Sequence, residues 1–408
     1  MPRPDTLYDW QRTLATILPD HHPAARDNLA AWSYALVCQK TFGLVTLAAF
    51  LAQYLGQKLN TVRQRLRELY QPAECKAGAA RTTFDPATLT RPLLAWITRD
   101  WTDRRLPLAL DASNLGARFT VLAASVVVRG TAVPVAWRVV AANQPGESWN
   151  DIWIALVARV RAALGPDWSV YVFTDRGLES PRLFRALATP GCHPVMRVKA
   201  GGHFRPAGWA DFHPVGDFAR HDGDRFAAAG VAYKGAGLPC TLVACRVAGC
   251  DDPWVLLTDL PPAAVDPRWY GFRGWIEELF RSAKRGRWGW QRTRMTDPAR
   301  AERCWAVIAV ASVWVVAVGC EEADAAEAAP RPESKSAPES KPSRPREANS
   351  PRRVRRVRVV LLGLTAITVG LLGGVLRVGR LTPEPWPTVQ PIPSVSEADF
   401  GRQKDTYP

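Results

Sequence analysis

The sequence changes character at Leu106, where strand-like segments begin to alternate with helical ones. Short runs rich in apolar and β-branched residues are bounded by Gly, Pro and Asp, which is typical of buried strands. In chain order, the segments are strands at 106–111, 119–128 and 132–140, a helix at 153–164, a strand at 168–173 and a helix at 181–188. This alternation predicts an α/β fold.

Three acidic residues stand where such a core exposes its functional groups. Asp111 ends the first apolar strand, Asp175 follows the strand at 168–173, and Glu277 lies on a later predicted helix. Ligands of α/β folds bind at the carboxyl ends of strands, and carboxylates that converge there can hold a pair of Mg²⁺ ions for phosphodiester cleavage. A single acid at a strand end is more often a helix N-cap, but three in this order in a basic protein favour a metal site.

The segment around Glu277 has a polar face that suits contact with phosphates. Residues spaced three, four and seven apart fall on one side of a helix, and here they are Tyr270, Arg273, Glu277, Arg281 and Lys284. Such a face lets the glutamate reach a metal while the cations bind flanking phosphates. A solvated helix with i,i+4 ion pairs gives the same pattern, so position alone does not decide between them.

The spacing Tyr-x₂-Arg-x₃-Glu-x₆-Lys resembles the signature of the insertion sequence 4 family of DDE transposases. Other segments are similar to the same family in the same order, and the resemblance covers residues 25 to 320. They are Leu110-Asp111-Ala112-Ser113, residues 129–137, Thr174-Asp175-Arg176-Gly177, and residues 197–199, 252–260 and 275–281.

The resemblance implies a ribonuclease H-like core with a β-rich insertion between the second and third catalytic acids. The helical spacing of apolar residues before residue 90 predicts a helical N-terminal domain. The expected division is a helical DNA-binding domain at 1–90, the first part of the core at 91–194, the insertion at 195–258, the second part of the core at 259–320, a disordered linker at 321–350 and a basic, apolar tail at 351–408. Two helices are predicted in the second part of the core and beyond the insertion, at 269–284 and 298–318. In the first domain, residues 60–69 fit either the second helix of a helix-turn-helix or a surface helix of a small bundle.

The resemblance also implies the roles of the site residues. Asp111, Asp175 and Glu277 would be catalytic and would hold two Mg²⁺ ions, with Mn²⁺ able to substitute. It also implies that Tyr270, Arg273 and Lys284 contact DNA phosphates. Further DNA contacts are expected from the dense basic segment after Glu277, namely Arg281, Arg285, Arg287 and Trp288. The expected partners are the terminal inverted repeats of a transposon and target DNA, bound by a homodimer in a paired-end complex.

The charge distribution favours a polyanionic partner. The chain of 408 residues has a formal net charge of +15, and most of it lies in two segments, residues 281–303 and 351–380. The first holds eight Lys and Arg residues and two acids, next to the proposed catalytic helix. Basic residues interleaved with tryptophans suit DNA backbone contact and base stacking.

The C-terminal tail contains the one segment that resembles a membrane span. Residues 359–376 are uncharged and mostly apolar, at the lower limit of length for a spanning helix. A docked or DNA-associated apolar tail is the favoured interpretation, so a membrane partner is not expected. The N-terminus has no apolar signal segment, and the expected location is the cytoplasm, associated with the nucleoid.

The hypothesis from the sequence is a cut-and-paste DNA transposase that cleaves transposon ends through a hairpin and transfers the freed 3′ end to target DNA. The alternative is a domesticated or inactive nuclease or DNA-binding derivative of the same fold. A third reading, a membrane-tethered protein, rests on residues 359–376 alone. Histidines at 193, 203, 213 and 221 are too loosely spaced to predict a zinc site.

Overall fold

The computed structural model describes residues 4–78, 81–143, 149–246, 252–329, 359–393 and 395–400. Ten α-helices occur in these residues. They are α1 (Pro4–Ile17), α2 (Pro23–Gln39), α3 (Leu44–Leu55), α4 (Leu59–Glu68), α5 (Thr90–Thr98), α6 (Trp149–Ala162), α7 (Pro181–Leu187), α8 (Ile276–Arg281), α9 (Pro298–Ala328) and α10 (Val359–Leu372).

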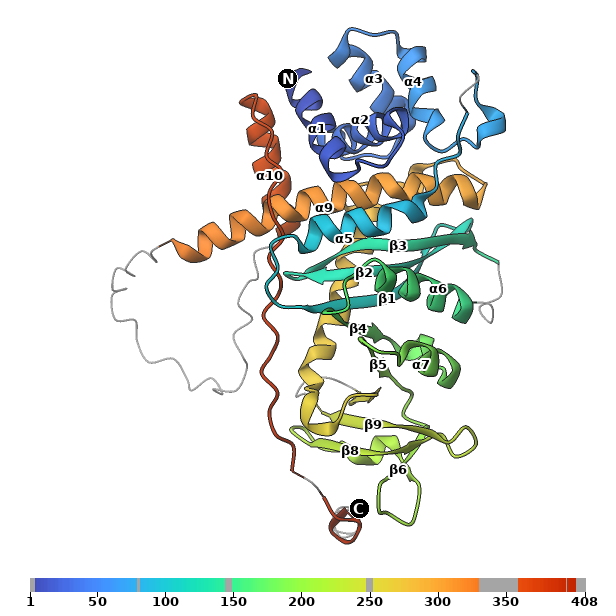
Figure 1. Cartoon of the computed structure of the whole chain (residues 1–408), viewed down its shortest axis with the longest axis vertical. Coiled ribbons are helices and arrows are strands. Elements are labelled where there is room, and N and C mark those ends of the chain that lie inside the picture. The colour runs from blue at the N-terminus through green and yellow to red at the C-terminus, as the bar shows by residue number, and fades with distance from the viewer. Residues whose placement is uncertain are drawn as a thin grey trace, which may run out of the picture.

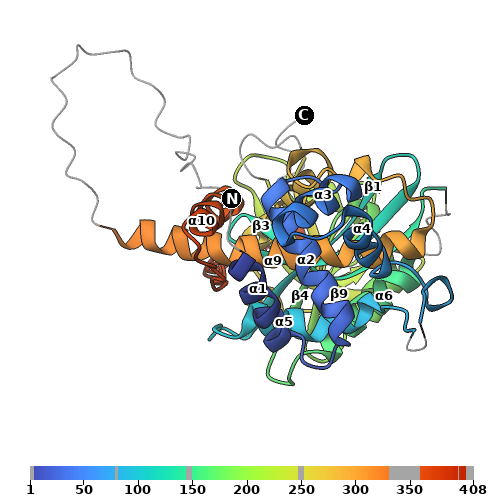
Figure 2. The same cartoon turned by 90° about the horizontal axis from the view of Figure 1, so that it is seen from above.

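Helices α1 to α4 form an N-terminal bundle that rests on the long helix α9 (Figures 1 and 2). Tryptophans fix this contact. The Trp10 ring stacks on the Trp314 ring of α9 with centroids 4.1 Å apart, and the Trp10 indole N–H donates to Ser33 Oγ at 2.9 Å. Large flat rings bury much apolar area with little loss of side-chain entropy, so these few residues hold the bundle against the rest of the chain.

A mixed sheet of ten strands runs through the molecule (Figure 1). The strand order is β3-β2-β1-β4-β5-β10-β9-β8-β6-β7. The strands are β1 (Arg105–Leu115), β2 (Phe119–Val128), β3 (Thr131–Ala141), β4 (Ser169–Thr174), β5 (Cys192–Arg197), β6 (His203–Pro206), β7 (His213–Pro214), β8 (Arg225–Ala232), β9 (Leu238–Cys245) and β10 (Trp254–Thr258). The α/β class predicted from the sequence is therefore confirmed.

Strand direction follows the length of each connection. β1, β2 and β3 form an antiparallel meander with short turns, whereas β1, β4 and β5 are parallel neighbours whose links contain α6 and α7. Parallel strands need such long crossovers, and antiparallel ones do not. Helix α6 lies on one side of the sheet, and the segment that contains α8, yellow in Figure 1, lies on the other.

The strands expected in an insertion at 195–258 do not form a sheet of their own. β5 pairs in parallel with β4, so it belongs to the central part of the sheet. β10 then pairs antiparallel with β5, and β9, β8, β6 and β7 continue outward from it. Pairing satisfies the backbone N–H and C=O groups that an edge at β5 would leave exposed.

The two helices predicted at 269–284 and 298–318 have different bounds in the structure. The first is a composite of a 3₁₀ helix, η7 (Pro267–Trp275), the short α8, and a π-helical turn, η8 (Ser282–Gly286). The second, α9, continues to Ala328, so the expectation of a disordered linker from residue 321 is wrong for its first eight residues. Those residues, EEADAAEA, are strong helix formers. The remainder of the predicted linker, 330–350, lies outside the described residues.

The tail helix α10 is docked on α9 through two glycines. A Cβ added to Gly363 would lie 1.9 Å from the Val315 carbonyl oxygen, and one added to Gly319 would lie 1.9 Å from the Val359 carbonyl oxygen. The two backbones thus approach more closely than any side chain permits. The prediction of a docked apolar tail agrees with this contact.

Membrane-length helices are few among the residues that the structure describes. α9 is long and apolar enough to cross a membrane, but 94% of its most apolar window is buried in the fold, and the bent pair of α2 and α3 passes the same test only as one span. α10 has 14 residues, fewer than the roughly 20 that a span requires.

Replacing Gly363 with Ala should destabilise the protein. The added methyl group must push α10 from α9, and overpacking of this kind costs roughly 1 to 3 kcal/mol, which exceeds the helix propensity gained. The free energy of unfolding from denaturant titration measures the effect. Gly235→Ala is the control, because no atom lies within 4 Å of its Cβ position. Unchanged stability of the Gly363 variant would contradict the docked position of α10.

Candidate active site

The parallel pairing of β1 and β4 brings Asp111 and Asp175 to one edge of the sheet. Ala109 pairs with Phe173, so the two acids stand two residues further along in both strands. Asp111 is still within β1, and Asp175 follows β4 directly. Asp175 also caps η4 (Arg176–Leu178), because its Oδ1 accepts a hydrogen bond from the Gly177 N–H at 2.9 Å.

The third acid comes from the segment η7–α8. Glu277 is in the first turn of α8 and is 61% exposed, and Arg273 precedes it by one helical turn in η7. The Arg273 guanidinium contacts all three acids. Its Nη2 lies 3.2 Å from Asp111 Oδ1 and 2.9 Å from Asp175 Oδ2, and its Nη1 lies 3.4 Å from Glu277 Oε1.

The cluster carries more negative than positive charge. The side chains of Arg273 and Asp111 are only 13% and 17% exposed, so solvent screens this pair weakly, whereas Glu277 is open to solvent. The pKa of Asp111 is raised to about 6, chiefly by burial, with the lowering effect of Arg273 opposed by the neighbouring Asp175 and Glu277. One guanidinium thus offsets three carboxylates only in part.

Comparison with protein families identifies the class. Residues 100–314 match the model of the Transposase DDE domain, a span of more than half the chain that contains all three acids. The chain belongs to the transposase DDE domain family. No curated protein matches it in a sequence comparison.

Transposases of the DDE class are named for their acidic residues and use divalent metal ions. The donor set of this transposase fits such ions, because carboxylate oxygens are the ligands that hard divalent cations take. The excess negative charge around Arg273 also favours a further cation. Within the described residues, no three acidic, His or Cys side chains are already spaced as a formed metal site. The guanidinium lies among the three carboxylates instead.

Two aromatic residues that the sequence predicted as DNA contacts or base-stacking candidates are buried. Tyr270 is 5% exposed, with its ring edge-on to Trp254 at 5.5 Å and the Arg197 guanidinium 5.9 Å from its centroid. Burial raises the pKa of Tyr270 to about 12, although Arg273 and Arg197 lower it. Trp288 is 1% exposed. In this conformation neither ring is accessible to a nucleotide.

The basic residues of the predicted DNA-contact set differ in exposure. Arg281 is 62% exposed and its Nη1 is 2.6 Å from Glu278 Oε2, whereas Arg287 is 17% exposed and bonds the other Glu278 oxygen at 3.0 Å. Lys284 is half-buried in η8. The Arg285 side chain lies outside the described residues. Among the members of this set whose side chains are described, Arg281 is the cation most open to a DNA strand.

Sequence reasoning missed Arg197 as a neighbour of the site. It contacts Tyr270 from β5, 73 positions earlier in the chain, and no local spacing connects the two residues. For Arg273, the sequence left open a phosphate contact and an i,i+4 ion pair. The i,i+4 spacing with Glu277 was a signal for an ion pair, but nothing local indicated that the two aspartates share the same cation.

Replacing Asp111 with Asn should stabilise the metal-free protein in a pH-dependent way. A folded-state pKa near 6 against an unfolded value of 3.8 means that the unfolded chain loses the proton first, so wild-type stability falls as pH rises from about 4 to about 6. Two pKa units correspond to roughly 2 to 3 kcal/mol.

The free energy of unfolding in EDTA should therefore favour the Asn variant at pH 7.5, and the difference should nearly vanish below pH 4. Asp167→Asn, at a carboxylate 59% exposed, serves as the control and should show no such gain. A difference independent of pH would show that Asp111 is not desolvated as described.

Proposed function

We propose that this transposase cleaves DNA at transposon ends and joins the freed 3′ ends to target DNA, as a member of the insertion sequence 4 family. Asp111, Asp175 and Glu277 are its catalytic acids. The observation that carries the proposal is the convergence of these three carboxylates, from β1, the end of β4 and α8, on one guanidinium.

The strand arrangement supports the ribonuclease H-like core that the resemblance implies. An antiparallel meander of β3, β2 and β1 is followed by the parallel strands β4 and β5, with the first two acids on the adjacent strands β1 and β4. The carboxyl ends of parallel strands are the usual ligand edge of α/β sheets, which agrees with a phosphodiester bound there.

The three carboxylates would hold two Mg²⁺ ions, for which Mn²⁺ can substitute. Such a pair activates water or a 3′-OH as nucleophile and stabilises the leaving oxygen in an in-line displacement. Arg273 holds the carboxylates together before the cations bind. Its planar fork of N–H donors suits a DNA phosphate once the acids have other partners. End cleavage through a hairpin, by a homodimer in a paired-end complex, completes the proposal.

A basic groove beside the N-terminal bundle suits a second DNA-binding region. The groove, with a volume of about 660 Å³, lies between α4 and residues 293–300. Four arginines line it against one acid, and its floor includes aromatic rings. The arginines are Arg63, Arg67, Arg294 and Arg300, and the acid is Asp297. Cationic walls around an accessible groove match the phosphates of a DNA backbone.

Glu277→Gln should abolish cleavage of DNA that carries transposon ends, and leave end binding largely intact. The amide keeps the size of the side chain and removes the charge that a cation needs. Gel-based cleavage and binding assays with Mg²⁺ report both properties. Glu74→Gln is the matched control at an exposed position of the N-terminal region. Cleavage retained by the Glu277 variant would contradict the catalytic assignment. A wild-type chain that binds transposon ends without cutting them would favour the alternative, an inactive derivative of the same fold.

Replacing Arg63 and Arg67 together with Ala should weaken DNA binding uniformly across sequences. Each lost phosphate contact lowers the slope of log affinity against log salt by about 1. A titration series at several salt concentrations gives the slope. Arg91→Ala removes an exposed arginine from α5, outside the groove, and should leave it unchanged. An equal slope for wild type and the double variant would exclude the groove as a DNA contact.

A further inference from the structure

The C-terminal tail packs along the side of the core. After α10 the chain runs in an extended path down the side of the sheet, red in Figure 1. Indole N–H groups from three separate elements donate hydrogen bonds to its carbonyl oxygens. The pairs are Trp314 with Arg377 at 2.6 Å, Trp101 with Leu381 at 3.0 Å and Trp269 with Pro387 at 2.8 Å.

One tail residue, Trp386, packs on aromatic residues that precede Asp175 and Arg273 in the chain. Its ring centroid lies 5.2 Å from that of Phe272, the residue before Arg273, and 6.3 Å from that of Phe173, two residues before Asp175. It also contacts Trp269 at 5.1 Å and Tyr171 at 4.9 Å. The tail therefore fills an aromatic pocket formed by β4 and η7, the two elements that carry Asp175 and Arg273.

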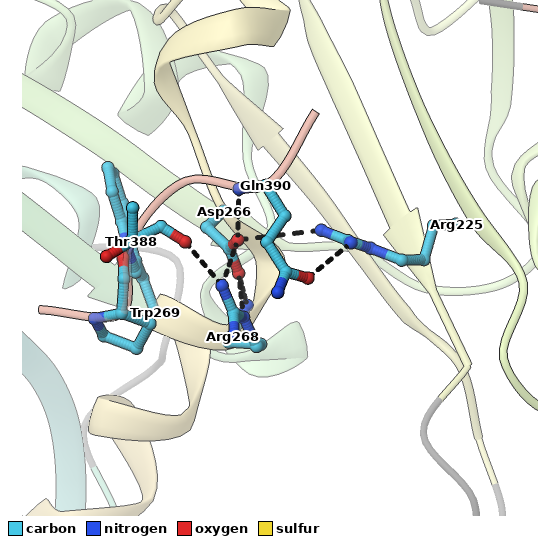
Figure 3. A network of polar contacts seen from close by, with 7 residues as sticks. Arg225, Asp266, Arg268, Trp269, Thr388 and Gln390 are labelled. Carbon is cyan, nitrogen blue, oxygen red and sulfur yellow. Dashed lines mark hydrogen bonds and ion pairs between the residues drawn. The ribbon is translucent and has the colours of Figure 1, made fainter. Parts of the chain in front are cut away.

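A buried carboxylate ties the same part of the tail to the start of η7. Asp266 is fully buried and caps η7, and its Oδ2 accepts a hydrogen bond from the Gln390 backbone N–H at 3.2 Å (Figure 3). Arg268 bonds both Asp266 oxygens at 2.8 Å and donates to the Thr388 carbonyl oxygen at 2.5 Å. Arg225 from β8 reaches the Gln390 Oε1 at 2.9 Å.

η7 needs such support because of its own geometry. A 3₁₀ helix has poorer hydrogen bonds than an α-helix, and runs beyond three or four residues are uncommon. η7 has nine residues and contains two glycines, Gly271 and Gly274, which add backbone freedom. The segment that presents Arg273, and next to it Glu277, is thus held mainly by what packs on it.

We propose that tail residues 381–390 are a positioning brace for the acid cluster, acting through η7. The proposal rests on the catalytic assignment of Glu277 for its functional consequence, but not for its structural one. The brace lies outside residues 100–314, the part of the chain that matches the family.

The test compares Trp386→Ala with Phe400→Ala in the full chain. Both residues are large tail aromatics packed on the body, but Phe400 lies at the far end, against Trp209 and Phe218. Hydrogen exchange of the backbone amides of residues 267–281, measured without metal, reports how firmly the brace holds this segment. Exchange there should quicken in the Trp386 variant and not in the Phe400 variant. The half-saturating Mg²⁺ concentration for cleavage should rise roughly tenfold or more in the Trp386 variant, as for outer-shell supports of metal sites.

Further variants separate bracing from general loss of stability. Trp386→Phe should restore most of the protection and metal response, and the milder Trp386→Leu keeps an apolar anchor if the Ala variant unfolds. Unchanged exchange at 267–281 in a folded Ala or Leu variant overturns the brace. Quickened exchange spread evenly over the protein also overturns it. If wild type cuts no DNA, the proposed function fails, while the exchange comparison still decides the brace.

Discussion

Three carboxylates and one guanidinium share the space at the ends of β1 and β4, and their charges constrain the structure around them. Burial, and to a smaller extent the negative charges of Asp175 and Glu277, raise the pKa of Asp111 to about 6. Arg273 offsets part of this repulsion. In the metal-free fold the cation among the acids is Arg273, and under the proposed function divalent ions would take over this role.

The surrounding structure fixes the positions of the two aspartates and of Glu277 relative to each other. Parallel pairing of β1 with β4 fixes both aspartates relative to each other, because a slip of one residue would send a side chain to the opposite face. Glu277 is held less rigidly than the two aspartates, because it follows the long 3₁₀ helix η7. Packing from β4 on one side and from Trp386 of the tail on the other compensates for that weakness.

Local pattern predicted the sheet well because strand residues repeat over short distances. The predicted bounds 119–128 agree with β2, and both aspartates fall at the expected edge. The mixed helical geometry of 267–286 and the burial of Tyr270 depend on partners far along the chain, which no local period encodes. Long-range packing outweighs propensity at such places. The end of α9 was predicted wrongly for a local reason. Residues 321–328 have a low-complexity composition, which indicated disorder although most of them have high helix propensity.

The central claim is that Asp111, Asp175 and Glu277 bind divalent cations together. Replacing Mg²⁺ with Fe²⁺ and adding ascorbate and peroxide generates hydroxyl radicals at the metal, which cut the backbone nearby. Fragment mapping of the intact chain should find cuts beside all three acids, and excess Mg²⁺ or the Glu277→Gln change should suppress them together. Cuts clustered elsewhere, or cuts beside the aspartates that persist unchanged in the Glu277 variant, would contradict a shared site.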